Sequence, residues 1–394
     1  MSVSEKIKES MEQSSWIRKM FEQGLELKSK FGAAKVFDFS LGNPNLEPPE
    51  KVKQAILEVM EDRRPGKHAY MPNAGLKETR EAVANFLSKE HGMKLTWEHI
   101  IMTCGAGGGL NIALKTLLDD KDEVIVLTPY FVEYLFYINN HNGIGQLINT
   151  NEDFSLDLKA IEAGINEKTK GIIINSPNNP SGRVYDENSL TSLGKILLKM
   201  GKRYDCTVYL LSDEPYSKLA YDGIRVPSVF KAYPYSLLVT SYSKDLSLPG
   251  ERIGFVAVNP EMENWRQVVD GLTFCNRILG FVNAPALMQR ILPGLQGVTV
   301  DIREYQRKRD LLCKGLSDSG YSFIKPEGAF YLFPKSPIPD DVLFVQTLLQ
   351  ENILAVPGMG FGSPGFFRLA YCVEDRVIRG SMEGFRRAIK KYTP

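Results

Sequence analysis

Residues 241–254 read Ser-Tyr-Ser-Lys-Asp-Leu-Ser-Leu-Pro-Gly-Glu-Arg-Ile-Gly, and this stretch combines one lysine, Lys244, with one arginine, Arg252. A lysine amine can form a Schiff base with a carbonyl compound. The arginine lies eight residues further on, beside a Pro-Gly turn. It can bind a phosphate through paired hydrogen bonds, and the nearby serine hydroxyls can add more. The stretch therefore predicts an anchor for a cofactor with a carbonyl and a phosphate group, such as pyridoxal phosphate.

The composition is that of a soluble protein with more than one domain. The chain has 394 residues, which exceeds the usual length of a single domain. Its net charge of +1 gives no reason to expect nucleic acid or an anionic membrane as a partner. No stretch is apolar enough to span a membrane, and the N-terminus has no apolar signal core. A cytoplasmic location is therefore expected.

The cysteines indicate free thiols rather than a metal site. They lie far apart and form no Cys-x-x-Cys pair: Cys104, Cys206, Cys275, Cys313 and Cys372. Unpaired cysteines of this kind are typical of a reducing compartment. No metal cofactor is expected.

Short apolar runs alternate with longer amphipathic stretches over the middle of the chain. Such runs are typical of strands that are buried on both faces of a sheet. The expected strands are residues 124–127, 171–174, 208–211 and 237–239, and the expected helices include 110–118 and 190–204. This alternation predicts an α/β fold, with a three-layer large domain built on a mostly parallel central sheet.

The end of the chain follows a different pattern. A helix is expected at 303–316, and strands are expected at 321–324, 329–333 and 368–371. This pattern indicates a smaller α+β domain. The first residues lack the α/β alternation, and we therefore expect both chain ends to build the smaller domain. The predicted division is 1–45 for an N-terminal arm and small-domain segment, 46–289 for the large cofactor-binding domain, and 290–394 for the C-terminal small domain.

Polar side chains follow three of the expected strands. Asn179 comes after 171–174, Asp213 and Tyr216 come after 208–211, and Lys244 comes after 237–239. Ligands of open α/β sheets bind beyond the carboxyl ends of the strands. Each segment alone would be interpreted as a turn or a helix cap, but their joint placement predicts a site. The glycine-rich run 104–110 precedes an apolar helix, and its backbone N–H groups can add an anion site.

These motifs resemble those of the fold type I pyridoxal phosphate enzymes, and among them the class I/II aminotransferases. The resemblance rests on Asp-Phe-Ser-Leu-Gly-Asn-Pro at 38–44, Asn-Asn-Pro-Ser-Gly at 178–182, Asp-x-x-Tyr at 213–216, and the stretch 241–254. It runs from Asp38 through Arg368, which is nearly the whole chain. It implies an enzyme that moves an amino group between an L-amino acid and a 2-oxo acid by a ping-pong mechanism.

The resemblance also implies roles for single residues. Lys244 is expected to form the Schiff base and then to act as acid and base. Asp213 is expected to keep the ring nitrogen protonated, which makes the ring an electron sink. Tyr216 and Asn179 are expected to bond the ring 3-oxygen, and Phe131 to stack on the ring. The implied catalytic residues are Lys244, Asp213 and Tyr216, and the implied cofactor-binding residues are Gly105, Ala106, Gly107, Phe131, Asn179, Asp213, Tyr216, Ser241, Ser243, Lys244, Arg252 and Tyr70.

Substrate binding and assembly follow from the same resemblance. Arg368 is implied to bind the substrate α-carboxylate, because a planar guanidinium suits a carboxylate. Gly42 and Asn179 are implied to lie beside that substrate. Tyr70 falls where the family supplies a tyrosine to the phosphate of the neighbouring subunit. A homodimer with shared active sites is therefore expected, with neither nucleic acid nor membrane as a partner.

The identity of the substrate stays open at this point. Aspartate with 2-oxoglutarate is a frequent pair in the family. However, residues 105–109 lack the lysine that one aspartate subgroup uses for the distal carboxylate, and Arg277 does not match the register of the arginine that another subgroup uses. The loop glycines can instead leave room for a bulkier side chain. A β-lyase with the same cofactor and a non-catalytic, cofactor-binding regulator are the two alternative hypotheses.

Overall fold

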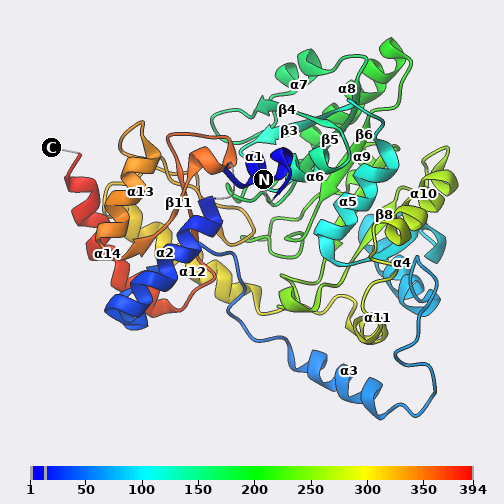
Figure 1. Ribbon diagram of the computed structural model, residues 1–394, viewed down its shortest axis with the longest axis horizontal. Coiled ribbons are helices and arrows are strands. Elements are labelled where there is room, and N and C mark those ends of the chain that lie inside the picture. The colour runs from blue at the N-terminus through cyan, green and yellow to red at the C-terminus, as the bar shows by residue number, and fades with distance from the viewer. Residues whose placement is uncertain (1–2, 13–15, 393–394) are drawn as a thin grey trace.

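The computed structural model describes residues 3–12 and 16–392 of the protein (Figure 1). Residues 1–2 and 13–15 of the predicted arm, and 393–394 of the predicted small domain, lie outside the described residues. The helices are α1 (Glu5–Glu12), α2 (Trp16–Phe31), α3 (Glu50–Glu61), α4 (Lys77–His91), α5 (Gly105–Leu117), α6 (Tyr134–Asn140), α7 (Leu158–Gly164), α8 (Glu187–Tyr204), α9 (Val229–Ala232), α10 (Trp265–Ile278), α11 (Ala286–Ile291), α12 (Ile302–Ser317), α13 (Asp341–Gln350) and α14 (Asp375–Lys390). The strands are β1 (Phe37–Asp38), β2 (Ile100–Thr103), β3 (Glu123–Thr128), β4 (Ile144–Asn149), β5 (Thr169–Asn175), β6 (Tyr209–Asp213), β7 (Ser236–Ser241), β8 (Gly254–Val258), β9 (Tyr331–Leu332), β10 (Ile353–Leu354), β11 (Val356–Pro357) and β12 (Phe367–Ala370).

The central sheet has seven strands in the order β2-β8-β7-β6-β5-β3-β4. The pairs from β4 through β7 are parallel, whereas β8 is antiparallel to both of its neighbours. All four strands expected from the middle of the chain belong to this sheet. The predicted α/β class with a mostly parallel sheet is therefore confirmed.

Each face of this sheet is covered by helices, which explains why its strands are apolar throughout. Successive residues of a strand point to opposite faces. Leu210 of β6 packs in a core with side chains of α4 and α8. The next residue, Leu211, packs in a second core with side chains of α5 and α10. A strand that is buried on both faces requires apolar residues at every position.

A third core joins the two ends of the chain. β1 pairs in parallel with β10, and Phe39, just after β1, packs against Phe385 of α14 with ring centroids 6.0 Å apart. A separate three-stranded sheet, in the order β11-β12-β9, contributes further side chains to this core. Figure 1 shows α2 beside α12, α13 and α14, at the opposite side of the molecule from α10.

The strand expected at 321–324 does not form, and this prediction was wrong. The backbone N–H of Tyr321 donates to Leu316 O at the end of α12, and the carbonyl of Ser322 accepts from Lys335 N. These groups are therefore engaged outside any strand ladder. The apolar side chains that suggested a strand are used in packing instead, since Tyr321 is buried among aromatic rings. The strands expected at 329–333 and 368–371 do form, as the short β9 and β12.

The glycine-rich run 104–110 forms the first turns of α5 rather than a loop before it. Glycine is a poor helix former, so tertiary packing overrides propensity here. A Cβ on Gly109 would lie 2.7 Å from Cγ1 of Val239 in β7. The absence of side chains therefore allows the start of this helix to approach the sheet closely.

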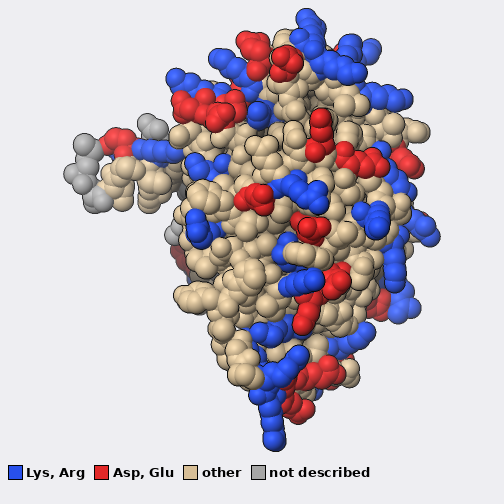
Figure 2. All heavy atoms as spheres, turned by 90° about the vertical axis from the view of Figure 1, so that its right-hand side faces the viewer, with Lys and Arg blue, Asp and Glu red and all other residues tan. Residues whose placement is uncertain are grey.

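The surface carries charges of both signs. Figure 2 shows basic and acidic side chains mixed over one face, in keeping with the net charge of +1. Among the described residues, no helix combines the length and the apolar character that a membrane crossing requires.

Candidate active site

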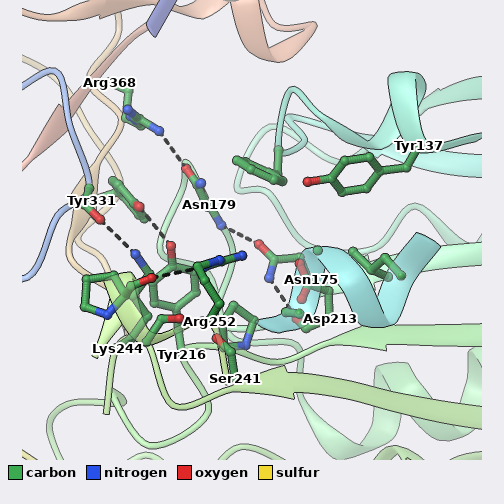
Figure 3. A pocket seen from close by; sticks show the side chains of 18 residues that line it. Tyr137, Asn175, Asn179, Asp213, Tyr216, Ser241, Lys244, Arg252, Tyr331 and Arg368 are labelled. Carbon is green, nitrogen blue, oxygen red and sulfur yellow. Dashed lines mark hydrogen bonds between the residues drawn. The ribbon is translucent and has the colours of Figure 1, made fainter. Parts of the chain in front are cut away.

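One pocket of about 290 Å³ brings most of the predicted site residues together. It lies where β5, β6 and β7 end, and it is lined by Gly42, Ala106, Gly107, Leu110, Phe131, Tyr137, Asn175, Asn179, Asp213, Pro215, Tyr216, Ser241, Ser243, Lys244, Pro249, Arg252, Tyr331 and Arg368 (Figure 3). Of the predicted site residues, Gly105 and Tyr70 are the two that do not line it. The parallel strands thus carry side chains that are distant in sequence to one edge of the sheet.

Asp213 is a buried carboxyl group at the end of β6. Tyr134 donates a hydrogen bond of 2.5 Å from Oη to its Oδ2. Its other carboxyl oxygen, Oδ1, is buried and has no hydrogen-bond partner among the described residues. Burial raises the pKa of Asp213 to about 7. A ligand that brings a positively charged donor to Oδ1 would satisfy this atom and favour the ionised carboxylate.

Lys244 presents a partly buried amine on the opposite side of the pocket from Tyr137 in Figure 3. Its Nζ donates a hydrogen bond of 2.8 Å to the carbonyl oxygen of Gly42. The ring centroid of Phe330 lies 5.4 Å from Nζ. Burial lowers the pKa of Lys244 from an ordinary 10.5 to about 8. A larger fraction of neutral amine is therefore present near neutral pH, and the neutral amine is the nucleophile.

The N-terminus of α5 borders the pocket. Ala106 and Gly107, in the first turn of this helix, border the pocket together with Ser241 and Arg252. Free N–H groups at a helix N-terminus favour a bound anion. Gly105 has φ +70°, and a Cβ there would lie 2.9 Å from Nη2 of Arg252. The positive φ favours glycine at this position, and the absence of a side chain leaves room for the guanidinium beside the helix.

Arg368 is a buried cation without an acidic partner in the described part of the chain. Its Nη1 donates to Oδ1 of Asn179 at 3.1 Å, and its Nη2 donates to the carbonyl oxygen of Ser40 at 2.6 Å. Its Nε has no partner among these residues. The guanidinium carbon lies 4.7 Å from the ring centroid of Tyr331. An unpaired buried charge is unfavourable, so this environment favours a carboxylate ligand.

A chain of hydrogen bonds connects the guanidinium of Arg368 to the backbone of Asp213 (Figure 3). Asn179, bonded to Arg368, donates its backbone N–H to Oδ1 of Asn175 at 2.7 Å. Asn175 in turn donates from Nδ2 to the carbonyl oxygen of Asp213 at 2.8 Å. The position of each polar group therefore depends on the others.

The structure also places four polar residues at the site that the sequence reasoning did not select. They are Tyr134, Tyr137, Asn175 and Tyr331. Tyr134 and Tyr137 are three residues apart in a stretch that forms α6, a spacing that places two side chains on one face of a helix. Tyr331 lies in the aromatic run 330–333, where the sequence does not distinguish a site residue from a core residue.

Comparison with known proteins places this pocket in a family. Residues 34–383 match the family model described as aminotransferase class I and II. The chain belongs to this family. It is 32% identical over 353 residues to the probable aspartate aminotransferase of Methanocaldococcus jannaschii, which covers 88% of this chain and 91% of that protein.

Solved structures agree with this assignment. An aminotransferase of Eubacterium rectale has a TM-score of 0.97 and 40% sequence identity, with 100% of both chains covered. The aspartate aminotransferase of Thermus thermophilus with maleate has a TM-score of 0.87 and 29% identity, covering 98% of this chain and 100% of that one. The protein is therefore a transferase with the fold of the aspartate aminotransferases.

Class I and II aminotransferases use pyridoxal phosphate, and the pocket residues fit this group. The unpartnered Oδ1 of Asp213 suits a protonated ring nitrogen. The cradle at Gly105, beside Arg252, suits a phosphate. The amine of Lys244 borders the same pocket and suits a covalent link to the carbonyl.

The lowered pKa of Lys244 predicts how the cofactor-free protein reacts with a small aldehyde. The rate of reductive methylation of Lys244 by formaldehyde, with a borane complex present in excess as the hydride donor, should rise about tenfold per pH unit and then level off above about pH 8, because only the neutral amine reacts. Mass spectrometry of the peptide that contains Lys244 measures this rate. A K244R variant is the control, and a rate that still rises through about pH 10 would contradict the assigned pKa.

Proposed function

We propose that the protein binds pyridoxal phosphate in this pocket and moves an amino group between L-aspartate and 2-oxoglutarate in two half-reactions. The observation that carries the proposal is that the amine of Lys244 and the unpaired guanidinium of Arg368 border one pocket. An amino acid carries an α-amino and an α-carboxylate group on one carbon. It can therefore meet both side chains at the same time.

The residues that would hold the cofactor come from separate elements. Lys244 would attach it covalently through Nζ, and Asp213 would face its ring nitrogen. Arg252, Ser241 and the first turn of α5 would bind its phosphate. The cofactor supplies an electron-withdrawing ring that stabilises negative charge on the substrate α-carbon.

Proton transfer is assigned to Lys244. Its hydrogen bond to the Gly42 carbonyl fixes the direction of Nζ within the pocket. Because its pKa is lowered to about 8, the released amine can accept the α-proton of the amino acid near neutral pH and donate it again.

Orientation of the substrate is assigned to Arg368. A carboxylate can bind the guanidinium at Nε, which has no partner among the described residues. Asn179 and Tyr331 hold the guanidinium from two sides, since one accepts its hydrogen bond and the other stacks on it. The side chain is therefore already oriented before a substrate binds.

The choice of aspartate rests on the names of the relatives. In the described part of the chain, the only cations that line the pocket are Lys244, Arg252 and Arg368. A distal carboxylate would therefore need a cation from outside this subunit. Of the loop glycines, Gly109 packs against Val239, whereas Gly107 lines the pocket and faces the hydroxyl of Tyr137. Room for a bulkier side chain beside Gly107 stays a prediction.

Single-turnover absorbance measurements test this function. The cofactor-loaded protein, mixed with L-aspartate alone, should lose the absorbance band of its lysine-bound cofactor, and 2-oxoglutarate should restore that band. A K244A variant cannot form the lysine-bound cofactor, so its rate is measured from the oxaloacetate released, and this rate should be about a thousandfold lower because the acid–base group is removed. K195A, which alters an exposed lysine of α8, is the control.

Two outcomes would contradict the proposal. One is that no amino acid in a panel converts the band. The other is that a cysteine conjugate releases pyruvate and ammonia while the band stays unchanged, as expected for a β-lyase.

We further infer a homodimer in which Tyr70 serves the site of the neighbouring subunit. Tyr70 is 89% exposed and lies outside the pocket of its own chain. Exposed apolar side chains occur nearby in sequence on α3 and also on α10: Ile56, Leu57, Met60, Phe274 and Ile278. Figure 1 shows α3 at the lower edge of the molecule, where it packs beside α11. Exposed apolar groups of this kind are typical of subunit interfaces.

Co-expression of two defective chains tests the shared site. A Y70A chain lacks the donated tyrosine, and a K244A chain lacks the lysine. In a mixed dimer, one of the two sites would combine an intact lysine with an intact tyrosine. Activity should therefore recover clearly above that of either variant alone. A monomer in sedimentation experiments, or no recovery in the purified mixed dimer, would contradict this arrangement.

A further inference from the structure

Tyr331 occupies a position between two groups with assigned roles. It lies on β9, and it is 3% exposed. Its hydroxyl lies 2.8 Å from the hydroxyl of Tyr216, and the two rings meet edge to face with centroids 5.6 Å apart. The Tyr331 ring also faces Arg368, whose guanidinium carbon is 4.7 Å from the centroid of this ring. One side chain thus contacts both the phenol and the arginine of the site (Figure 3).

The position of this ring is fixed by its surroundings. A Cβ on Gly42 would lie 1.9 Å from the Tyr331 hydroxyl and 2.7 Å from its Cζ. The ring therefore occupies the space that any side chain at position 42 would need. Among the described residues, Tyr216 provides the hydrogen-bond partner of the Tyr331 hydroxyl. A phenol packed this tightly keeps its contact with little freedom to rotate.

The direction of this hydrogen bond determines what Tyr216 can do. A phenol has one hydrogen to donate and can also accept. If Tyr331 donates, the hydrogen of Tyr216 stays available for a ligand in the pocket. If Tyr216 donates, its hydrogen is used within the protein.

The positive charge of Arg368 favours Tyr331 as the donor. A cation over an aromatic ring stabilises negative charge that develops on its oxygen, which makes the phenol a stronger acid. Burial raises the pKa of Tyr331 to about 12, and Arg368 opposes this rise. Burial also raises the pKa of Tyr216, to well above its ordinary value, and Tyr331 adds to that rise. Arg368 lowers the pKa of Tyr216 too, but it counts for more at Tyr331, whose ring it contacts and where it is the second cause after burial. The stronger acid of the pair is the better donor.

We propose that Tyr331 is a positioning residue: it donates a hydrogen bond to Tyr216 and so directs the Tyr216 hydrogen toward the cofactor. Through the same contacts, binding of a carboxylate at Arg368 changes how strongly Tyr216 donates to the cofactor. This inference rests on the proposed function. A carboxylate bound at Arg368 would neutralise the guanidinium and weaken the donation from Tyr331. Tyr216 would then donate less strongly to the ring oxygen of the cofactor. The nitrogen of Lys244 would in consequence keep its proton to higher pH.

A pH titration of the absorbance of the bound cofactor tests this proposal. In Y331F, the midpoint of the titration should rise by about half a pH unit, because Tyr216 loses the donor that supports it. In the wild-type protein, maleate should raise the midpoint as it binds Arg368, and this rise should be smaller in Y331F. The affinity for maleate should stay within about twofold of wild type, because phenylalanine keeps the ring over the guanidinium.

Two further variants separate this role from a merely structural one. Y321F removes a hydroxyl that donates to Phe385 O at 3.0 Å within the third core, away from the pocket, and it should leave the midpoint unchanged. Y331L removes the ring, and it should both shift the midpoint and weaken maleate binding.

One outcome would overturn the role of Tyr331 and leave the proposed function intact: the wild-type protein shows a pH-dependent cofactor band, and Y331F has the same titration midpoint. Absence of any cofactor band in the wild type would instead overturn the proposed function, and this inference with it.

Discussion

The burial of the Asp213 carboxyl group at the end of β6 is the constraint on which the site depends. A buried carboxylate is unfavourable unless its oxygens are bonded or a cation lies close. The protein satisfies one oxygen with Tyr134 and leaves the other without a partner among the described residues. Burial with a single hydrogen-bond donor raises the pKa of Asp213 to about 7. A cationic ring nitrogen would complete it, and the pocket would then hold the group that its chemistry requires.

The two ends of the chain reach this pocket from outside the central sheet. Ser40 accepts a hydrogen bond from Arg368, and Gly42 accepts one from Lys244. β1 pairs with β10 just before these residues, so the third core holds the N-terminal segment in place. A substrate carboxylate at Arg368 would therefore bind beside segments from both ends of the chain. Tyr331 contacts both Arg368 and Tyr216, so it lies between the proposed carboxylate site and the proposed cofactor site.

The sequence predicted those features that depend on strand order and on specific motifs. Asn179, Asp213 and Lys244 follow strands that run in parallel, so their convergence at one edge was foreseeable. The contacts of Tyr134 and Tyr331 depend on how rings pack in three dimensions, and no spacing rule encodes such packing. The missing strand at 321–324 shows the same limit, because its apolar side chains fit a core and a strand equally well. The anion site at the glycines of α5 stays a prediction, and their close packing against the sheet was not predicted from the sequence.

The affinity of the protein for pyridoxal phosphate in a D213N variant tests the central claim most directly. Asparagine keeps the size of the side chain and removes its charge. The dissociation constant should rise about a hundredfold, because the ring nitrogen loses its counter-charge. The matched control is E214Q, which alters the adjacent buried carboxyl group that accepts a hydrogen bond from Ser212 and does not line this pocket. An unchanged dissociation constant in D213N, with the fold intact, would contradict the account.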